Sequence, residues 1–160
     1  MRALVWITEA SWEICVDRAR ELVPADAEVT ILHVAASDVE QLAEHPGPGR
    51  LGRRHRPPPA RTVREISDAE ARSLLAAAAE RLGRPVDTLA RRGRIEREVV
   101  QVSADFDVLV LARDGETRRG PKSIGHDARF VVDHAGCTVL LGWAAEPPGL
   151  ESMHWPPHLR

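Results

Sequence analysis

Residues 107–142, DVLVLARDGETRRGPKSIGHDARFVVDHAGCTVLLG, contain the pattern that decides the fold. Residues 107–112 and 138–143 are apolar runs of the kind found in strands that helices cover on both faces. Between the two runs, apolar residues from Ala128 to Ala135 recur at helical spacing. A strand, a helix and a second strand in this order predict two parallel strands joined by a right-handed crossover.

The preceding residues repeat this alternation of strands and helices. Apolar runs predict strands at residues 3–7, 29–34 and 86–90, and helical spacing predicts helices at residues 11–23 and 64–82 and from Ile95 to Phe106. Leu22 and Ile66 are among the residues that we expect to face the core. The sequence therefore predicts an α/β fold, a doubly wound five-stranded parallel sheet with helices on both faces, of the Rossmann-like kind.

The length and composition are those of one soluble domain. With 160 residues, the chain is long enough to bury a core but short for two domains. A formal net charge of -2 argues against a nucleic-acid partner, because domains that bind nucleic acid usually carry a basic excess. No apolar run is long enough for a membrane span, and no signal peptide is evident. Cys15 and Cys137 make neither a disulfide framework nor a metal-binding cluster, so we expect a cytoplasmic protein without a bound metal.

Two segments fall outside the alternating pattern. Residues 46–62 are rich in Pro, Gly and Arg and predict a mobile loop, because such a segment neither continues a helix nor buries apolar area. Residues 144–160 form a C-terminal tail, which leaves residues 1–143 as the domain. The tail contains HWPPH, whose prolines exclude the helix that would align its two histidines on a metal.

The stretch after the strand at residues 107–112 also contains a spaced motif, which reads A-x2-G-x9-G-H at residues 112–126. The last strand then begins near Cys-Thr-Val at residues 137–139. This arrangement resembles the last β-α-β unit of the universal stress proteins, in which a strand is followed by G-x2-G-x9-G-[ST], a helix and a strand that begins near Cys-Pro-Val. The spacing is the same, while two of the four motif residues differ. With Leu-His-Val at residues 32–34 and the order of elements, the resemblance extends over most of residues 3–143.

The residue types in the motif suit a phosphate. Glycine at Gly115 lets a ligand approach the backbone closely, because no Cβ intervenes. Gly125 stands just ahead of a predicted helix, whose first N–H groups and positive dipole end favour an anion. Arg118, Arg119 and Lys122 add positive charge to the same loop. Turn geometry, a helix start and a solvated loop explain these same residues without a ligand.

The resemblance implies an adenine nucleotide site, as in the wider class of adenine nucleotide alpha hydrolase-like folds. The candidate site residues are Thr8, Glu9, Val34, Ala112, Gly115, Gly125 and His126. The backbone of Val34 would meet the adenine edge, and the acidic residue that the family places after its first strand would fall at Thr8 or Glu9. Gly115 would approach the phosphates, and Gly125 with His126 would bind the distal ones.

Two residues depart from the family motif. Ala112 adds a methyl group where the family keeps the backbone bare. His126 replaces a small hydroxyl with an imidazole, which either fills the phosphate site or, when protonated, donates to a phosphate.

The sequence is consistent with two main functions. The first is a regulatory, non-catalytic domain that holds ATP or AMP, with Mg present only on the nucleotide. The second is a nucleotide-free dimeric adaptor that binds a protein partner through the Arg/Pro-rich loop or the tail. An enzyme has the least support, because no catalytic motif stands out. We also expect a homodimer through residues 138–143, because an uncharged edge strand invites pairing, unless the tail covers that edge.

Overall fold

The computed structural model describes residues 1–37, 60–143 and 146–153, with side chains in the second range from residue 64. The strands are β1 (Arg2–Ile7), β2 (Glu28–Ala36), β3 (Asp87–Gly93), β4 (Val108–Arg113) and β5 (Thr138–Trp143). The α-helices are α1 (Trp12–Leu22), α3 (Ala60–Leu82), α4 (Ile95–Ser103) and α5 (His126–His134). Two short 3-10 helices follow β4 and β5, η1 (Pro121–Ser123) and η2 (Leu150–Ser152).

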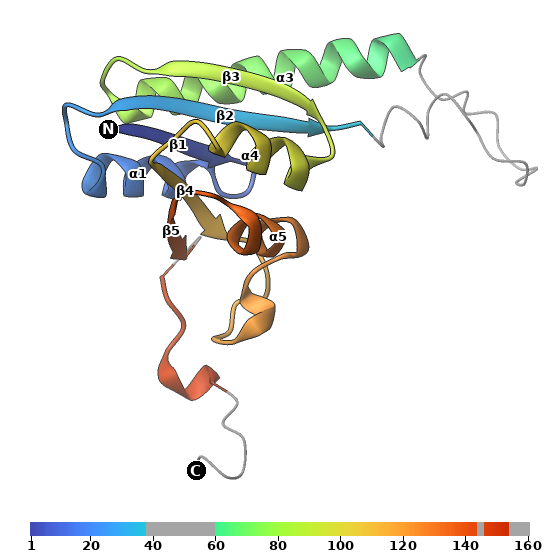
Figure 1. The fold of residues 1–160 in the computed structure, drawn as a ribbon. Coiled ribbons are helices and arrows are strands. Elements are labelled where there is room, and N and C mark those ends of the chain that lie inside the picture. The colour runs from blue at the N-terminus through green and yellow to red at the C-terminus, as the bar shows by residue number, and fades with distance from the viewer. Residues whose placement is uncertain (38–59, 144–145, 154–160) are drawn as a thin grey trace, which may run out of the picture.

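The strands form one sheet in the order β3-β2-β1-β4-β5 (Figure 1), and all four neighbouring pairs are parallel. The predicted doubly wound five-stranded parallel sheet is therefore confirmed. The strand order reverses between β1 and β4, because the chain first extends the sheet from β1 through β2 to β3 and then returns to the other side of β1. In open sheets of this kind, ligands bind beyond the carboxyl ends of the strands near that reversal.

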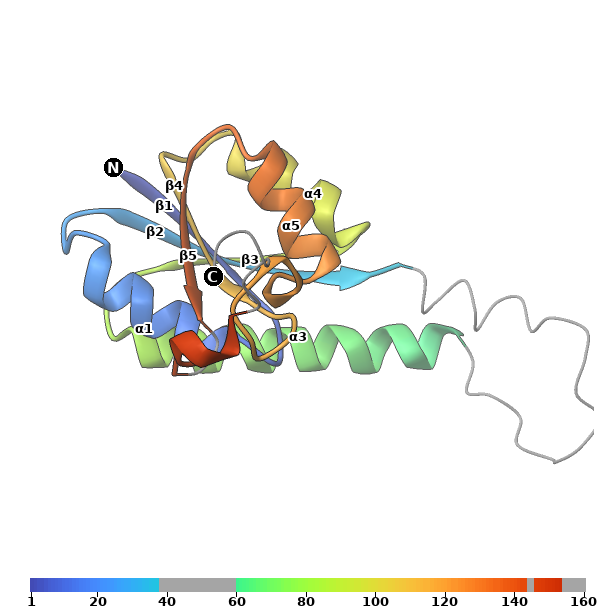
Figure 2. The same cartoon turned by 90° about the horizontal axis from the view of Figure 1, so that it is seen from below.

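Helices cover both faces of the sheet (Figure 2), with α1 and α3 on one face and α4 and α5 on the other. Alternate residues of each strand enter the two cores. In β2, Ile31 packs in the core under α1 and α3, whereas Leu32 and Val34 pack in the core under α4 and α5. The central strand β1 is buried from Ala3 to Ile7, which explains its uninterrupted apolar sequence.

The helix α3 begins earlier than the sequence predicts. It starts at Ala60 and not near Arg64, so residues 60–62 are helical and the prediction of a loop there is wrong. Residues 46–59 of the predicted loop lie outside the described residues. Leu22 and Ile66 do not face the core as expected, since they are 59% and 52% exposed. Helical periodicity alone does not separate residues that face the core from residues at its rim.

The strand β5 forms one edge of the sheet, and β3 forms the other. The described part of the tail turns back toward the loop after β4, where Pro148 O accepts a hydrogen bond of 2.7 Å from Arg119 Nε. The hydroxyl of Ser152 in η2 accepts a hydrogen bond of 3.2 Å from the Arg119 amide. Among the described residues, no helix combines the length and apolar character that crossing a membrane would require.

Candidate functional site

The crevice at the carboxyl ends of the strands is divided into two main cavities. The larger, which we call the β2 pocket, has a volume of about 410 Å³. It is lined by Thr8, Glu9, His33, Val34, Ala35, Ala36, Ile66, Ser67, Glu70, Arg92 and Ile95. The smaller, which we call the β4 cavity, has a volume of about 180 Å³ and lies over the first residues after β4, beside Trp143 of β5. The volume of the β2 pocket falls in the range of small-molecule sites.

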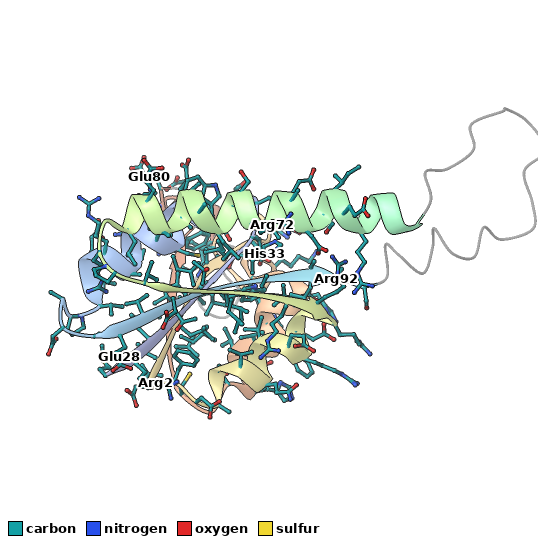
Figure 3. The ribbon with its side chains drawn as sticks, turned by 90° about the horizontal axis from the view of Figure 1, so that it is seen from above. Arg2, Glu28, His33, Arg72, Glu80 and Arg92 are labelled. Atoms are coloured by element: carbon teal, nitrogen blue, oxygen red, sulfur yellow. The ribbon has the colours of Figure 1, made fainter. Side chains whose placement is uncertain are left out.

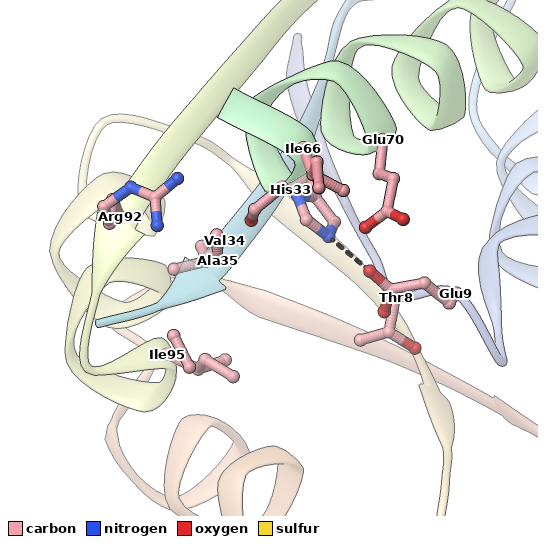
Figure 4. Close-up of a pocket in the computed structure, with 11 residues that line it drawn as sticks. Thr8, Glu9, His33, Val34, Ala35, Ile66, Glu70, Arg92 and Ile95 are labelled. Atoms are coloured by element: carbon pink, nitrogen blue, oxygen red, sulfur yellow. Dashed lines mark hydrogen bonds and ion pairs between the residues drawn. The ribbon is translucent and has the colours of Figure 1, made fainter. Parts of the chain in front are cut away.

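The β2 pocket combines apolar walls with a few polar groups (Figure 4). Ile66 of α3 and Ile95 of α4 come from opposite faces of the sheet, and Val34 and Ala35 come from the end of β2. Ile66 is half exposed because it points to this pocket and not to the core. Apolar side chains with few convergent polar groups are the usual lining of sites for flat organic ligands.

His33 is the buried polar group of the β2 pocket. It lies between α3 and the sheet (Figure 3), and its Nε2 is 3.1 Å from Glu9 Oε1. The side chain of His33 is 7% exposed, whereas that of Glu9 is 79% exposed. Nδ1 of His33 is buried without a hydrogen-bond partner among the described residues. The rim also contains Arg92, whose Nη2 donates to Asp68 Oδ1 at 2.6 Å.

The β2 pocket and the β4 cavity are separated by a polar partition. The hydroxyls of Thr8 and Ser11 share a hydrogen bond of 2.8 Å at the end of β1. Across from them, Ala112 lies near the end of β4 and Asp114 directly follows that strand. The space that these four residues enclose with Trp6 and Leu111 is about 10 Å³, the room of one water molecule at most. The space at the point where the strand order reverses is therefore small.

Gly115 lets two parts of the loop after β4 pack closely against each other. A Cβ at this position would lie 2.2 Å from the Lys122 carbonyl oxygen and 3.0 Å from the Ser123 carbonyl oxygen. The Gly115 amide donates to the Ser123 carbonyl at 3.1 Å, and the next amide, of Glu116, donates to the Lys122 carbonyl at 2.8 Å. The bare backbone therefore allows two parts of the same loop to pack together.

Gly125 caps α5 with help from Asp114. The Gly125 amide donates to Asp114 Oδ1 at 2.8 Å, and a Cβ on Gly125 would lie 2.7 Å from that oxygen. The next residue, His126, has an 87% exposed side chain, with Nδ1 3.2 Å from Asp127 Oδ1. Gly125 and His126 are not among the described residues that line either cavity. The helix start is thus occupied by a carboxylate of the protein itself.

The cations of the loop also have partners within the chain. Arg118 Nε lies 2.5 Å from Glu116 Oε2, and Lys122 Nζ lies 3.7 Å from Glu116 Oε1. Arg119 binds the tail segment through Pro148, as described above. The Arg113 guanidinium stacks on the ring of Trp143, 4.8 Å from its centroid, and Nη1 donates to Ser123 Oγ at 2.6 Å.

The seven predicted site residues thus fall into two groups. Thr8, Glu9 and Val34 come together around the β2 pocket, and Glu9 is the acidic residue that turns toward it. Ala112 lies in the partition, and Gly115, Gly125 and His126 lie on the other side of it.

Sequence reasoning missed His33 and Asp114. Each had a signal: His33 is a titratable residue inside an otherwise apolar strand, and Asp114 is an acidic residue inside a motif read as a phosphate site.

The described part of the crevice contains neither a metal-binding cluster nor a reactive thiol. Among the residues that the structure describes, no group of three or more His, Cys, Asp or Glu side chains could hold a metal ion. Burial raises the pKa of the Cys15 thiol to about 12; a hydrogen bond with Ser11 lowers the pKa, and the negative charge of Asp114 raises it further. Burial also raises the pKa of Cys137. Both residues are free cysteines, and these pKa shifts disfavour the nucleophilic thiolate.

The structure is a doubly wound α/β domain with a pocket at the carboxyl ends of its strands. Solved structures with a similar fold include the following three. The hypothetical protein MJ0577, a structural-genomics test case for assigning biochemical function, has a TM-score of 0.67 at 18% identity, over 89% of this chain and 94% of that one. A universal stress protein in complex with cAMP has a TM-score of 0.61 at 15% identity, over 91% and 98%. A universal stress protein family protein from Arabidopsis thaliana with AMP bound has a TM-score of 0.59 at 16% identity, over 91% and 93%.

This chain therefore has the universal stress protein fold, as its motif spacing predicted. A scan against protein-family models gave no match, and a search of the curated proteins gave none either. The likeness lies in the three-dimensional arrangement and extends over nearly the whole of both chains.

Proposed function

We propose that this chain is a universal stress protein-like domain that binds an adenine-containing ligand in the β2 pocket and acts by binding, not by catalysis. The observation that carries the proposal is the pocket itself, about 410 Å³ at the carboxyl ends of β1 and β2, with apolar walls and the hydrogen-bonded Glu9–His33 pair in its lining. Two proteins of the same fold, as their descriptions state, hold AMP and cAMP. That likeness supports an adenine compound as the ligand class.

In this proposal the adenine ring lies between Ile66 and Ile95 and meets the backbone at Val34. Glu9 accepts hydrogen bonds from the ligand, because its carboxylate is exposed and only one of its oxygens faces His33. Ala112, Gly115, Gly125 and His126 belong to the side where a nucleotide's phosphates would extend. Magnesium would enter only on a nucleotide, since no protein cluster for it is found among the described residues.

The first test is to identify the ligand that the protein retains. Purified protein is denatured, and the released small molecules are analysed by mass spectrometry. A stoichiometric adenine compound supports the proposal. If none is released, calorimetric titration with adenosine and AMP decides, and absence of binding at millimolar concentrations would overturn it.

A pocket variant adds a matched control. Ile66→Asp places a charge on the apolar wall of the β2 pocket, and Leu150→Asp places the same charge on a leucine of η2 that is somewhat more exposed and lies outside that pocket. We expect the first variant to lose about tenfold or more in affinity, because burying a charge against an apolar ring is costly, and the second to keep it. Equal affinities for the two variants would count against the β2 pocket.

The second part of the proposal is a homodimer through residues 138–143. This segment is β5, an edge strand whose residues from Val139 to Trp143 are half-buried and uncharged. The other edge strand, β3, carries Asp87, Arg91 and Arg92, charges that discourage pairing. Two copies related by a twofold axis would place their β5 strands antiparallel. The described tail residues contact the loop after β4, and Pro147 borders Leu140 and Trp143 in a shallow cavity beside the edge.

Light scattering tests the dimer. Leu140→Lys should shift the mass from dimer to monomer, whereas Thr88→Lys, the same change on the exposed β3 edge, should leave it unchanged. A wild-type protein that stays monomeric at high micromolar concentration would instead favour coverage of the edge by the tail. The alternative function, a nucleotide-free adaptor with a protein partner, would combine a dimer with no adenine ligand. A cytoplasmic location and the division into a domain, 1–143, and a tail, 144–160, stay predictions.

A further inference from the structure

The start of α5 already holds an anion. Asp114 Oδ1 accepts the hydrogen bond of the Gly125 amide at 2.8 Å, eleven residues along the chain. A Cβ built on Gly125 would lie 2.7 Å and 3.0 Å from the two carboxylate oxygens. The side of Gly125 that lacks a side chain is therefore filled by the carboxylate and is closed to an arriving phosphate.

The electrostatics of this position suit Asp114. The first turn of a helix carries a partial positive charge, which stabilises a carboxylate as well as a phosphate. Asp127 in the first turn of α5 adds a second negative charge. A phosphate at the same place would have to displace one carboxylate and approach another.

The polar partition lies between the β2 pocket and the loop after β4. It contains Ala112 and the Thr8–Ser11 hydrogen bond, and the space beside them is about 10 Å³. The cations that would attract phosphates are engaged, Arg118 and Lys122 with Glu116 and Arg119 with the tail. The groups of this loop that would meet phosphates are therefore bound to other groups of the chain.

We infer that Asp114 takes the place of the phosphate in this protein, so that the ligand of the β2 pocket is an adenine nucleoside without phosphate groups. The inference rests on the proposed function, from which it takes adenine as the nucleobase. It adds that the ligand carries no phosphate group. Asp114 determines specificity by occupying the Gly125 amide, and it contacts no part of the nucleoside.

Calorimetry with adenosine and ATP at fixed ionic strength tests this. The wild-type protein should bind adenosine about tenfold or more tightly than ATP. Asp114→Ala frees the Gly125 amide and should raise ATP affinity by about tenfold or more, while adenosine affinity stays the same. Asp127→Ala is the matched control, because it removes the same charge from the same helix start but leaves the Asp114 hydrogen bond in place. It should give a clearly smaller gain.

ATP binding as tight as adenosine binding in the wild-type protein would overturn the inference, as would equal gains in the two variants. Should Asp114→Ala fail to fold, Asp114→Asn keeps an acceptor for the Gly125 amide and removes only the charge. It should then gain no more ATP affinity than Asp127→Ala, and a gain of about tenfold would overturn the role of the hydrogen bond.

A second measurement separates this inference from the proposed function. Inorganic tripolyphosphate contains the phosphates without the nucleoside, so its effect on the melting temperature reports on the loop alone. It should stabilise Asp114→Ala and leave the wild-type protein and Asp127→Ala nearly unchanged. If no adenine compound binds any variant but tripolyphosphate stabilises Asp114→Ala, the proposed function fails and the role of Asp114 stands. If tripolyphosphate and ATP affect Asp114→Ala no more than the wild-type protein, the role of Asp114 is refuted.

Discussion

The two sides of the crevice differ in how their polar groups are satisfied. On the side of the β2 pocket, the Glu9 carboxylate is largely exposed and a nitrogen of His33 is buried without a partner among the described residues. On the side of the loop after β4, the Asp114 carboxylate, the Gly125 amide and the Arg119 guanidinium all bind other groups of the chain. The first side leaves polar groups that a ligand could meet, whereas the polar groups of the second side bind one another. A motif spacing can thus be kept for structural reasons after its ligand contacts are replaced.

The largest expected effect is on the pH dependence of the free energy of unfolding, and it comes from Cys15, which packs in the core. Its pKa is raised from the ordinary 9.0 to about 12 by burial. The unfolded chain loses the thiol proton from about pH 9 and the folded chain only near pH 12. The contribution of the protonated thiol to the free energy of unfolding is therefore fully present below pH 9. It is lost as pH rises from 9 to 12, by about 1.4 kcal/mol per pH unit. Urea unfolding at several pH values measures the loss.

Few other side chains change charge between pH 9 and 12, because the chain has no tyrosine and Lys122 is its single lysine. Cys15→Ala should remove most of the pH dependence, whereas Cys137→Ala, at a half-buried position, should remove a smaller part. An unchanged slope in Cys15→Ala would show that the buried thiol is not the cause.

The next largest effect concerns the packing of the loop after β4. Gly115→Ala should lower the free energy of unfolding by about 2 kcal/mol, because the added methyl group would overlap the carbonyl oxygens of Lys122 and Ser123. Gly136→Ala, where a Cβ would meet nothing within 4 Å, should change it by less than about 0.5 kcal/mol. Tryptophan fluorescence during urea unfolding measures both. Equal values would mean that the loop rearranges freely around a side chain.

A smaller effect concerns the carboxylate that caps α5. Asp114→Ala should cost about 1 kcal/mol of unfolding free energy, as the loss of a helix cap usually does. Hydrogen exchange at the Gly125 amide should speed up in the variant, because that amide loses its acceptor. No change in either quantity would contradict a structural role for Asp114.

The smallest expected effect is on the open side. Glu9→Gln should change stability by less than about 0.5 kcal/mol, because the carboxylate is mostly exposed and the amide oxygen can still meet His33 Nε2. A loss above 1 kcal/mol would show that Glu9 is structural in the same sense as Asp114, and the contrast between the two sides would disappear.

Much of the fold could be read from local patterns. The residues of β5, 138–143, agree with the prediction at both ends, because the run TVLLGW is bounded by Gly136 and the Pro-containing tail. The start of α3 was missed by four residues, since its first turn lies in the Arg/Pro-rich segment, where composition favours a loop. Thr8, Glu9 and Val34 were found as neighbours because the carboxyl ends of parallel strands meet at one edge.

The sequence by itself determined the parallel α/β class, the order of elements and the edge of the sheet at which the β2 pocket lies, because apolar periodicity and strand polarity are local properties of the chain. Only the tertiary structure decided that the Asp114 carboxylate reaches the Gly125 amide and that Gly115 packs on its own loop. Both contacts depend on how residues 114–125 fold back on themselves, and loop conformation follows from packing against the rest of the protein. A glycine that admits a ligand and one that admits the protein's own backbone look the same in sequence, because each is defined by what fills the space where a side chain is missing.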